Sequence, residues 1–152
     1  MEMEKSHYLQ FYGMVALTFV SMYVLMYAMV NAFGNVYANL NQFYMAGLMV
    51  APMAIVELVL MRAVYRNKRL NAAIIAISSA ALIVFWALIR QQAGIGDRQF
   101  LRSMIPHHAS AILMCEKAPI SDPAIKDLCR NIIASQQAEI DQMKALLNRL
   151  DR

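Results

Sequence analysis

The side chains best suited to chemistry gather in the stretch MIPHHASAILMC, which runs from residue 104 to residue 115. It combines thioethers, imidazoles and a thiol, the soft or borderline ligands that suit Cu(I) and its larger analogue Ag(I). On a helix, residues three and four apart share a face, so the stretch forms two neighbouring rows. The members of these rows are Met104, His107, His108, Ala111, Met114 and Cys115.

A second amphipathic stretch offers facing side chains that complete such a site. Its apolar face carries Cys129, Gln136 and Met143, and Glu139 lies at the edge of that face. The combined set predicts a soft-metal site formed by His107, His108, Met104, Met114, Met143 and Glu139.

Glu139 is expected to orient one of the histidines, but the same pairing has a second interpretation. A buried polar group left unpaired costs roughly 1–3 kcal/mol, so buried histidines need polar partners whether or not metal binds. Glu139 and Gln136 could supply those partners in a metal-free core. The spacing leaves both interpretations open.

Cys115 and Cys129 raise a related question. An oxidising compartment permits a disulfide between them. Counted outward from the turn between their helices, the two positions differ by about 6 Å at 1.5 Å per residue. That offset is awkward for a bridge whose Cα atoms must lie within about 7 Å. We expect buried free thiols in preference to a disulfide or to ligation, and leave all three possible.

Other kinds of function find less support. The sequence contains no CxxC, HExxH or GxSxG motif, and the two amphipathic stretches offer no clear nucleophile, base and orienting group, so we expect no enzyme. The net charge of +4 comes with no basic stripe interleaved with aromatic residues, which disfavours nucleic acid as a partner.

The site must be positioned by a chain whose first part is strongly apolar. Hydrophobic residues make up 60% of the 152 residues, and charges are sparse before residue 90. A span of about 20 apolar residues crosses a bilayer core. We predict transmembrane helices over residues 8–30, 42–61 and 71–89, which form a membrane domain over residues 1–90.

The charges around the spans predict their orientation. The loop between the first two spans, residues 31–41, is uncharged, whereas the next loop carries Arg62, Arg66, Lys68 and Arg69. Basic loops remain in the cytoplasm. Three crossings then place the N-terminus inside and residues 91–152 outside, which in a bacterium means the periplasm or the cell exterior.

Methionines and one acid stand out within the spans. The chain has thirteen methionines, far above ordinary usage, and six of them form stripes at residues 22, 26 and 29 and at residues 45, 49 and 53. Flexible packing explains either stripe, although two facing stripes could also pass a soft monovalent ion. Glu57 is the only acid within a span and could reach Arg62 or water.

Residues 91–152 are expected to form an exported hairpin of two amphipathic helices. The first ends before Pro119 and contains Pro106, which would bend it; the second begins at Asp122 and Pro123, an N-cap followed by proline at the first position. One hairpin of this size is too small to bury a sufficient hydrophobic core by itself. We therefore predict an all-α membrane protein in which two chains complete a four-helix bundle.

The stretch from Arg98 to Leu147 resembles the bacterial domain-of-unknown-function family 305. The resemblance rests on the paired histidines and the spaced methionines together with a QxEIxxM pattern in the second helix. These residues are Phe100, Met104, His107, His108, Ala111, Met114, Gln137, Glu139, Ile140 and Met143.

The resemblance implies a ferritin-like helical bundle, and some members are similar to exported copper-binding proteins that act in copper resistance. This sequence departs from the family pattern at Cys115, where a small residue is more usual, and it has only one hairpin. Together with the residues, it predicts a soft-metal-binding protein of the bacterial inner membrane that acts in copper or silver homeostasis. The alternative is a metal-free module that dimerises through its hairpin, and a transporter formed by several chains is a third possibility.

Overall fold

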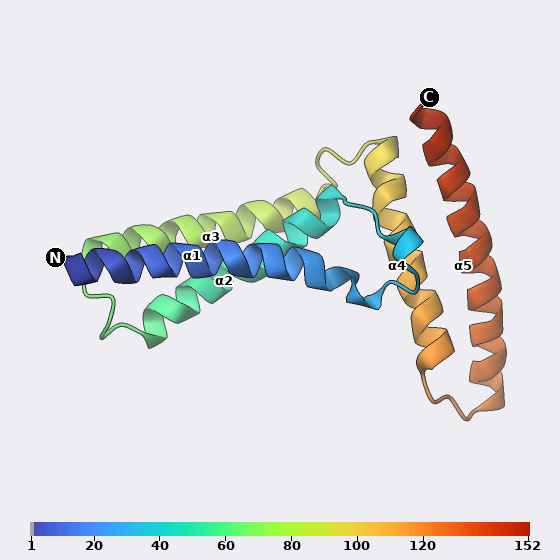
Figure 1. Ribbon diagram of the computed structural model, residues 1–152, viewed down its shortest axis with the longest axis horizontal. Coiled ribbons are helices and arrows are strands. Elements are labelled where there is room, and N and C mark those ends of the chain that lie inside the picture. The colour runs from blue at the N-terminus through green and yellow to red at the C-terminus, as the bar shows by residue number, and fades with distance from the viewer. Residues whose placement is uncertain (1) are drawn as a thin grey trace. The chain divides into compact units, whose positions relative to one another are not determined.

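The computed structural model describes residues 2–152, and all of its regular structure is helical (Figure 1). Two short 3-10 helices, η1 and η2, separate the first two α-helices. The elements are α1 (Glu2–Leu25), η1 (Met26–Met29), η2 (Phe33–Asn35), α2 (Leu40–Leu60), α3 (Lys68–Arg90), α4 (Asp97–Lys117) and α5 (Pro123–Leu150). Contacts divide the chain into two compact units, of which the first holds residues 1–25 and 41–93 and the second holds residues 26–40 and 94–152.

Three helices are long and apolar enough to cross a membrane. These segments are Ser6–Met29, Leu40–Leu60 and Lys68–Arg90. Most of their side chains point outward, since only 6%, 33% and 6% of the most apolar windows are buried inside the protein. In water such exposure would be costly, whereas in hydrocarbon it is not. The predicted presence of three such helices is confirmed, with ends that differ from the predicted ones by up to three residues.

The first unit has a core of aromatic and aliphatic side chains near the α2–α3 turn. Tyr8 and Phe11 of α1 pack there with Tyr65, whose ring centroid lies 5.3 Å and 5.7 Å from theirs. Polar groups in this core are paired: the Tyr8 hydroxyl donates to Asn71 Oδ1 at 2.7 Å, and Asn71 Nδ2 donates to the Tyr65 carbonyl at 2.8 Å. These bonds satisfy groups for which hydrocarbon offers no partner.

Close packing of α2 on α3 depends on a glycine. A Cβ atom placed on Gly47 would lie 2.4 Å from the ring of Phe85, which is an impossible contact. The Phe85 ring in turn lies 6.3 Å from that of Phe43, and Phe43 stacks edge-on against Phe19 at 5.0 Å. A small residue at position 47 therefore lets an aromatic cluster join the three helices of this unit.

The second unit contains the hairpin of α4 and α5, which run side by side in opposite directions (Figure 1). The Asp122 carboxylate caps α5 by accepting hydrogen bonds from the amides of Ala124 and Ile125 at 2.8 and 3.1 Å, as the Asp-Pro pair predicts. Helix α4 continues through Pro106. The hairpin core consists of Leu101, Ile105, Ala109, Ile112, Ile140, Met143 and Leu147.

The segment from Met26 to Leu40 belongs to this second unit rather than forming a free loop. Val30 and Tyr37 pack against the hairpin core. Buried asparagines give the segment its shape: Asn35 donates to Asn31 Oδ1 at 2.8 Å, and Asn39 donates to the Tyr37 carbonyl at 3.0 Å. The Leu40 amide donates to Gln99 Oε1 of α4 at 3.1 Å, which ties the segment to the hairpin.

Candidate metal centre

His108 is the buried member of the predicted site. It is 9% exposed, and its Nδ1 atom lies 3.0 Å from Glu139 Oε2 on the facing helix. The two atoms are at ion-pair distance, but Nδ1 lacks the alignment of a hydrogen bond to any described residue. Glu139 is half exposed, so one side of the pair reaches solvent. The expected partnership of Glu139 with a histidine is thus present in the structure.

Burial favours the neutral imidazole of His108. Desolvation lowers the pKa of His108 below its usual 6.5; the Glu139 carboxylate opposes this shift, and His107 adds to it. A neutral ring that carried its proton on Nδ1, beside the carboxylate, would leave the lone pair of Nε2 free for a metal ion. Burial therefore favours the neutral form that a metal ion requires.

Two methionines lie in the same interface between α4 and α5, which we call the seam. Met104 lies one turn before His108 on α4, and Met143 lies one turn after Glu139 on α5. Because the helices are antiparallel and His108 is level with Glu139, Met104 and Met143 occupy corresponding positions one turn farther along the two helices. Met143 is 8% exposed, and Met104 packs against the core that contains it.

The remaining two predicted ligands point away from this seam. His107 is exposed, and Met114 is 58% exposed. The expectation that both histidines face the apolar half of α4 is wrong for His107, because neighbouring helical residues point about 100° apart and the seam with α5 is narrower than half a turn. The structure pairs His108 with Glu139 and packs Met104 and Met143 in the hairpin core, and it leaves His107 and Met114 on the outside.

The donor types in the seam decide which ions it fits. Within residues 2–152, no three His, Cys, Asp or Glu side chains gather in one place, so thioethers must supply part of any coordination shell. One imidazole and two thioethers form a soft set that fits Cu(I) or Ag(I) and fits Mg²⁺ or Ca²⁺ poorly. The residues present are therefore compatible with the expected class of ion.

The cysteines are bridged, which corrects the expectation of free thiols. Cys115 and Cys129 form a disulfide, and their Cα atoms are 5.2 Å apart. The predicted axial offset is absent because the connecting loop leaves α4 and enters α5 through extended residues, Ala118 and Asp122. Helix α5 can therefore begin beyond the end of α4, farther from the hairpin core. This brings Cys115 and Cys129 to the same height along the two helices.

Glu57 and the α2 methionines have simpler surroundings than a site would need. The Tyr65 hydroxyl donates to Glu57 Oε1 at 3.3 Å, which pairs the acid with a neutral group from the turn rather than with Arg62. The methionines at positions 45, 49 and 53 are 38–40% exposed and lie opposite the buried face of α2. Within this chain, that stripe faces outward.

The comparisons with known proteins identify the family. The model described as Domain of unknown function (DUF305) matches residues 87–150, the segment that contains the hairpin. The chain is 39% identical over 138 residues to "Uncharacterized protein L153" of Acanthamoeba polyphaga mimivirus, and the match covers 89% of each chain. This chain belongs to the DUF305 family, and that similarity extends beyond the hairpin. No solved structure matches the chain.

Sequence reasoning missed one structural part of the second unit. The Tyr27 hydroxyl donates to the Tyr37 carbonyl at 2.7 Å, and both tyrosines belong to the segment that packs on the hairpin. Residues 31–41 resemble a solvated loop because they contain Gly and Asn without any apolar period. The only feature of the sequence that could have indicated packing on the hairpin was the presence of tyrosine and valine among the asparagines.

Proposed function

We propose that this protein is a membrane-anchored binder of a soft monovalent metal ion, Cu(I) or Ag(I), that acts in metal homeostasis or resistance. The supporting observation is the buried imidazole of His108, which has Glu139 at Nδ1, together with the thioethers of Met104 and Met143 in the hairpin core. In this proposal Nε2 and the two thioethers hold the ion. His107 and Met114 are too far round the helix to join the same shell without a change of conformation.

The proposal treats the protein as a binder and not as an enzyme. Thioethers bind metal without releasing a proton, whereas the imidazole must be neutral. The lowered pKa of His108 keeps the ring available over most of the neutral range. The Glu139 carboxylate beside His108 would offset part of the desolvation cost of a monovalent cation in the partly buried seam.

The proposed setting is a cell membrane with the hairpin on its non-cytoplasmic side. The basic turn with Arg62, Arg66, Lys68 and Arg69 supports a cytoplasmic α2–α3 connection. The disulfide supports an oxidising compartment for the hairpin. Two crossings, α2 and α3, separate residues 26–40 from residues 94–152, so the packing of both segments in one unit agrees with this topology. The resemblance implies a bacterial inner membrane, whereas the mimivirus relative shows that similar chains also occur outside bacteria.

The test is a competition titration of the purified full-length protein with Cu(I) and Ag(I). Replacing Met104 and Met143 together with leucine preserves side-chain volume and removes both thioethers. We expect affinity to fall at least tenfold in this variant and in His108→Ala. The matched control, His107→Gln with Met114→Leu, should stay within twofold of the wild type. Equal affinities for all four proteins would refute the proposed site.

A metal-free assembly role is the second candidate, and the exposed stripe of α4 favours it. Phe100, His107 and Met114 recur every seven residues, and Phe100 and Met114 are 50% and 58% exposed. Such a spacing suits helix pairing with a second copy, which would complete a four-helix bundle. Replacing Phe100 and Met114 with serine should then shift the detergent-solubilised protein from dimer to monomer in light scattering. Ala138→Ser, on an exposed face of α5, is the control, and an unchanged mass in all variants excludes this interface.

A further inference from the structure

The end of the hairpin that carries the disulfide has almost no hydrophobic core. The buried residues of α5 are Ile140, Met143 and Leu147, all in its second half. From residue 123 to residue 131 every side chain is exposed except that of Cys129, which is partly buried. Ile125 and Leu128, although apolar, are 48% and 56% exposed. The bridge to Cys115 is therefore the main connection between this part of α5 and α4.

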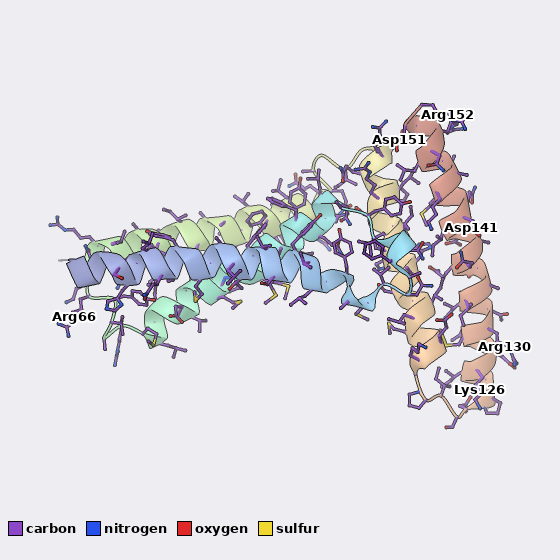
Figure 2. All side chains as sticks on the ribbon, in the orientation of Figure 1. Arg66, Lys126, Arg130, Asp141, Asp151 and Arg152 are labelled. Carbon is purple, nitrogen blue, oxygen red and sulfur yellow. A yellow bond between two sulfur atoms is a disulfide. The ribbon has the colours of Figure 1, made fainter. Side chains whose placement is uncertain are left out.

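A cavity lies against this disulfide. Its volume is about 290 Å³, and its lining includes both cysteines, Ile120, Lys126 and Arg130. Such a volume can admit a small thiol compound. Lys126 and Arg130 lie on α5 at the end near the connecting loop, as Figure 2 shows. Both basic side chains belong to the lining of the space next to the sulfur atoms.

The charge around the cavity selects the kind of molecule that would enter it. Lys126 has no carboxylate partner among the described residues, and Arg130 pairs with Asp127, which does not line the cavity. A thiolate is the attacking species in disulfide exchange, and a departing cysteine also carries negative charge. Nearby cations stabilise both, in the same way that they lower the pKa of reactive cysteines.

We propose that the Cys115–Cys129 disulfide is a thiol-exchange site that prefers small anionic thiols. An incoming thiolate attacks one cysteine sulfur, forms a mixed disulfide and releases the other cysteine as a thiolate. A second incoming thiolate then attacks the mixed disulfide. The small thiols leave as their own disulfide, two electrons remain on the protein, and each cysteine thiolate takes up one proton from water.

Exchange at this site has a structural consequence. With the bridge open, residues 123–131 lose their main connection to α4, whereas the core around Ile105 and Ile140 remains packed. The two thiols released at this end are also soft ligands. The site therefore links the thiol content of the surroundings to the order of one end of the hairpin, independently of metal binding in the seam.

The experiment measures the reduction rate of the full-length protein in detergent with three thiols of similar size. These are 2-mercaptoethanesulfonate, 2-mercaptoethanol and 2-aminoethanethiol, and free cysteines are trapped by alkylation and counted by mass spectrometry. Rates are divided by the thiolate concentration of each reagent. We expect the sulfonate to react about fivefold faster than the amine at low salt, and the ratio to approach one at 1 M salt, where the Debye length is about 3 Å.

Variants distinguish this site from general surface charge. Lys126→Gln with Arg130→Gln should abolish the preference for the anionic thiol, whereas the control, Lys144→Gln with Arg149→Gln, should retain it. A preference that survives in the first variant, or disappears in the control, overturns the proposal. Equal rates for all three thiols in the wild type also overturn it, because reduction would then depend on opening of the hairpin rather than on entry into the cavity.

Discussion

Replacing Cys115 and Cys129 together with serine should loosen one end of the hairpin and leave the other end intact. The bridge joins residues separated by 14 positions. A cross-link that closes a loop of about 15 residues stabilises the folded state by about 3 kcal/mol, through the entropy it removes from the open chain. Since few apolar contacts hold residues 123–131, most of this free energy should be lost from local opening at that end.

Hydrogen–deuterium exchange of the full-length protein in detergent provides the assay. A loss of about 3 kcal/mol corresponds to a change of about 100-fold in the opening equilibrium. Amides in residues 124–131 should exchange faster by up to that factor, and amides around Ile105 and Ile140 should change by less than threefold, because their core does not include the bridge. Reduction of the wild-type protein should reproduce the pattern. Unchanged exchange in residues 124–131, or an equal increase throughout the hairpin, would refute the reasoning.

Three further predictions concern stability. The lowered pKa of His108 means that the unfolded chain binds a proton more readily than the folded chain, so stability should fall as pH drops below about 6.5, and His108→Gln should flatten this dependence in thermal unfolding. Gly47→Ala should destabilise the first unit by about 1–3 kcal/mol, because the new methyl group meets the Phe85 ring. Tyr65→Phe should cost about 1 kcal/mol through loss of the bond to Glu57, measured by thermal denaturation in detergent.

Matched variants give each of these predictions a control. His107→Gln changes an exposed neighbour and should retain the loss of stability at low pH. Gly13→Ala places a methyl group where nothing lies within 4 Å, so it should be neutral or slightly stabilising in a helix. Tyr12→Phe removes a hydroxyl from a side chain that is 49% exposed, and its effect should be small. A control that destabilises as much as its partner contradicts the corresponding explanation.

Composition, capping residues and hydrophobic periodicity predicted most of the fold. Three strongly apolar stretches are each long enough to cross a bilayer core, and this property depends on composition rather than on contacts. The Asp122–Pro123 pair fixed the start of α5 because capping is a local interaction. The amphipathic pattern of residues 97–150 likewise identified both hairpin helices, and the DUF305 model matches residues 87–150, which contain them.

The tertiary structure decided the features that depend on which residues meet. A helical wheel places His107 and His108 on one half of α4, but only the partner helix determines that His108 is buried and His107 is exposed. The spacing of Cys115 and Cys129 left their pairing open, because the path of the loop sets their relative height. The packing of residues 26–40 on the hairpin has little local signal, since the hydrogen bond that ties the segment to α4 joins Leu40 to Gln99, which are distant in sequence. Composition and hydrophobic periodicity therefore determine the helices, whereas contacts between the helices determine the site.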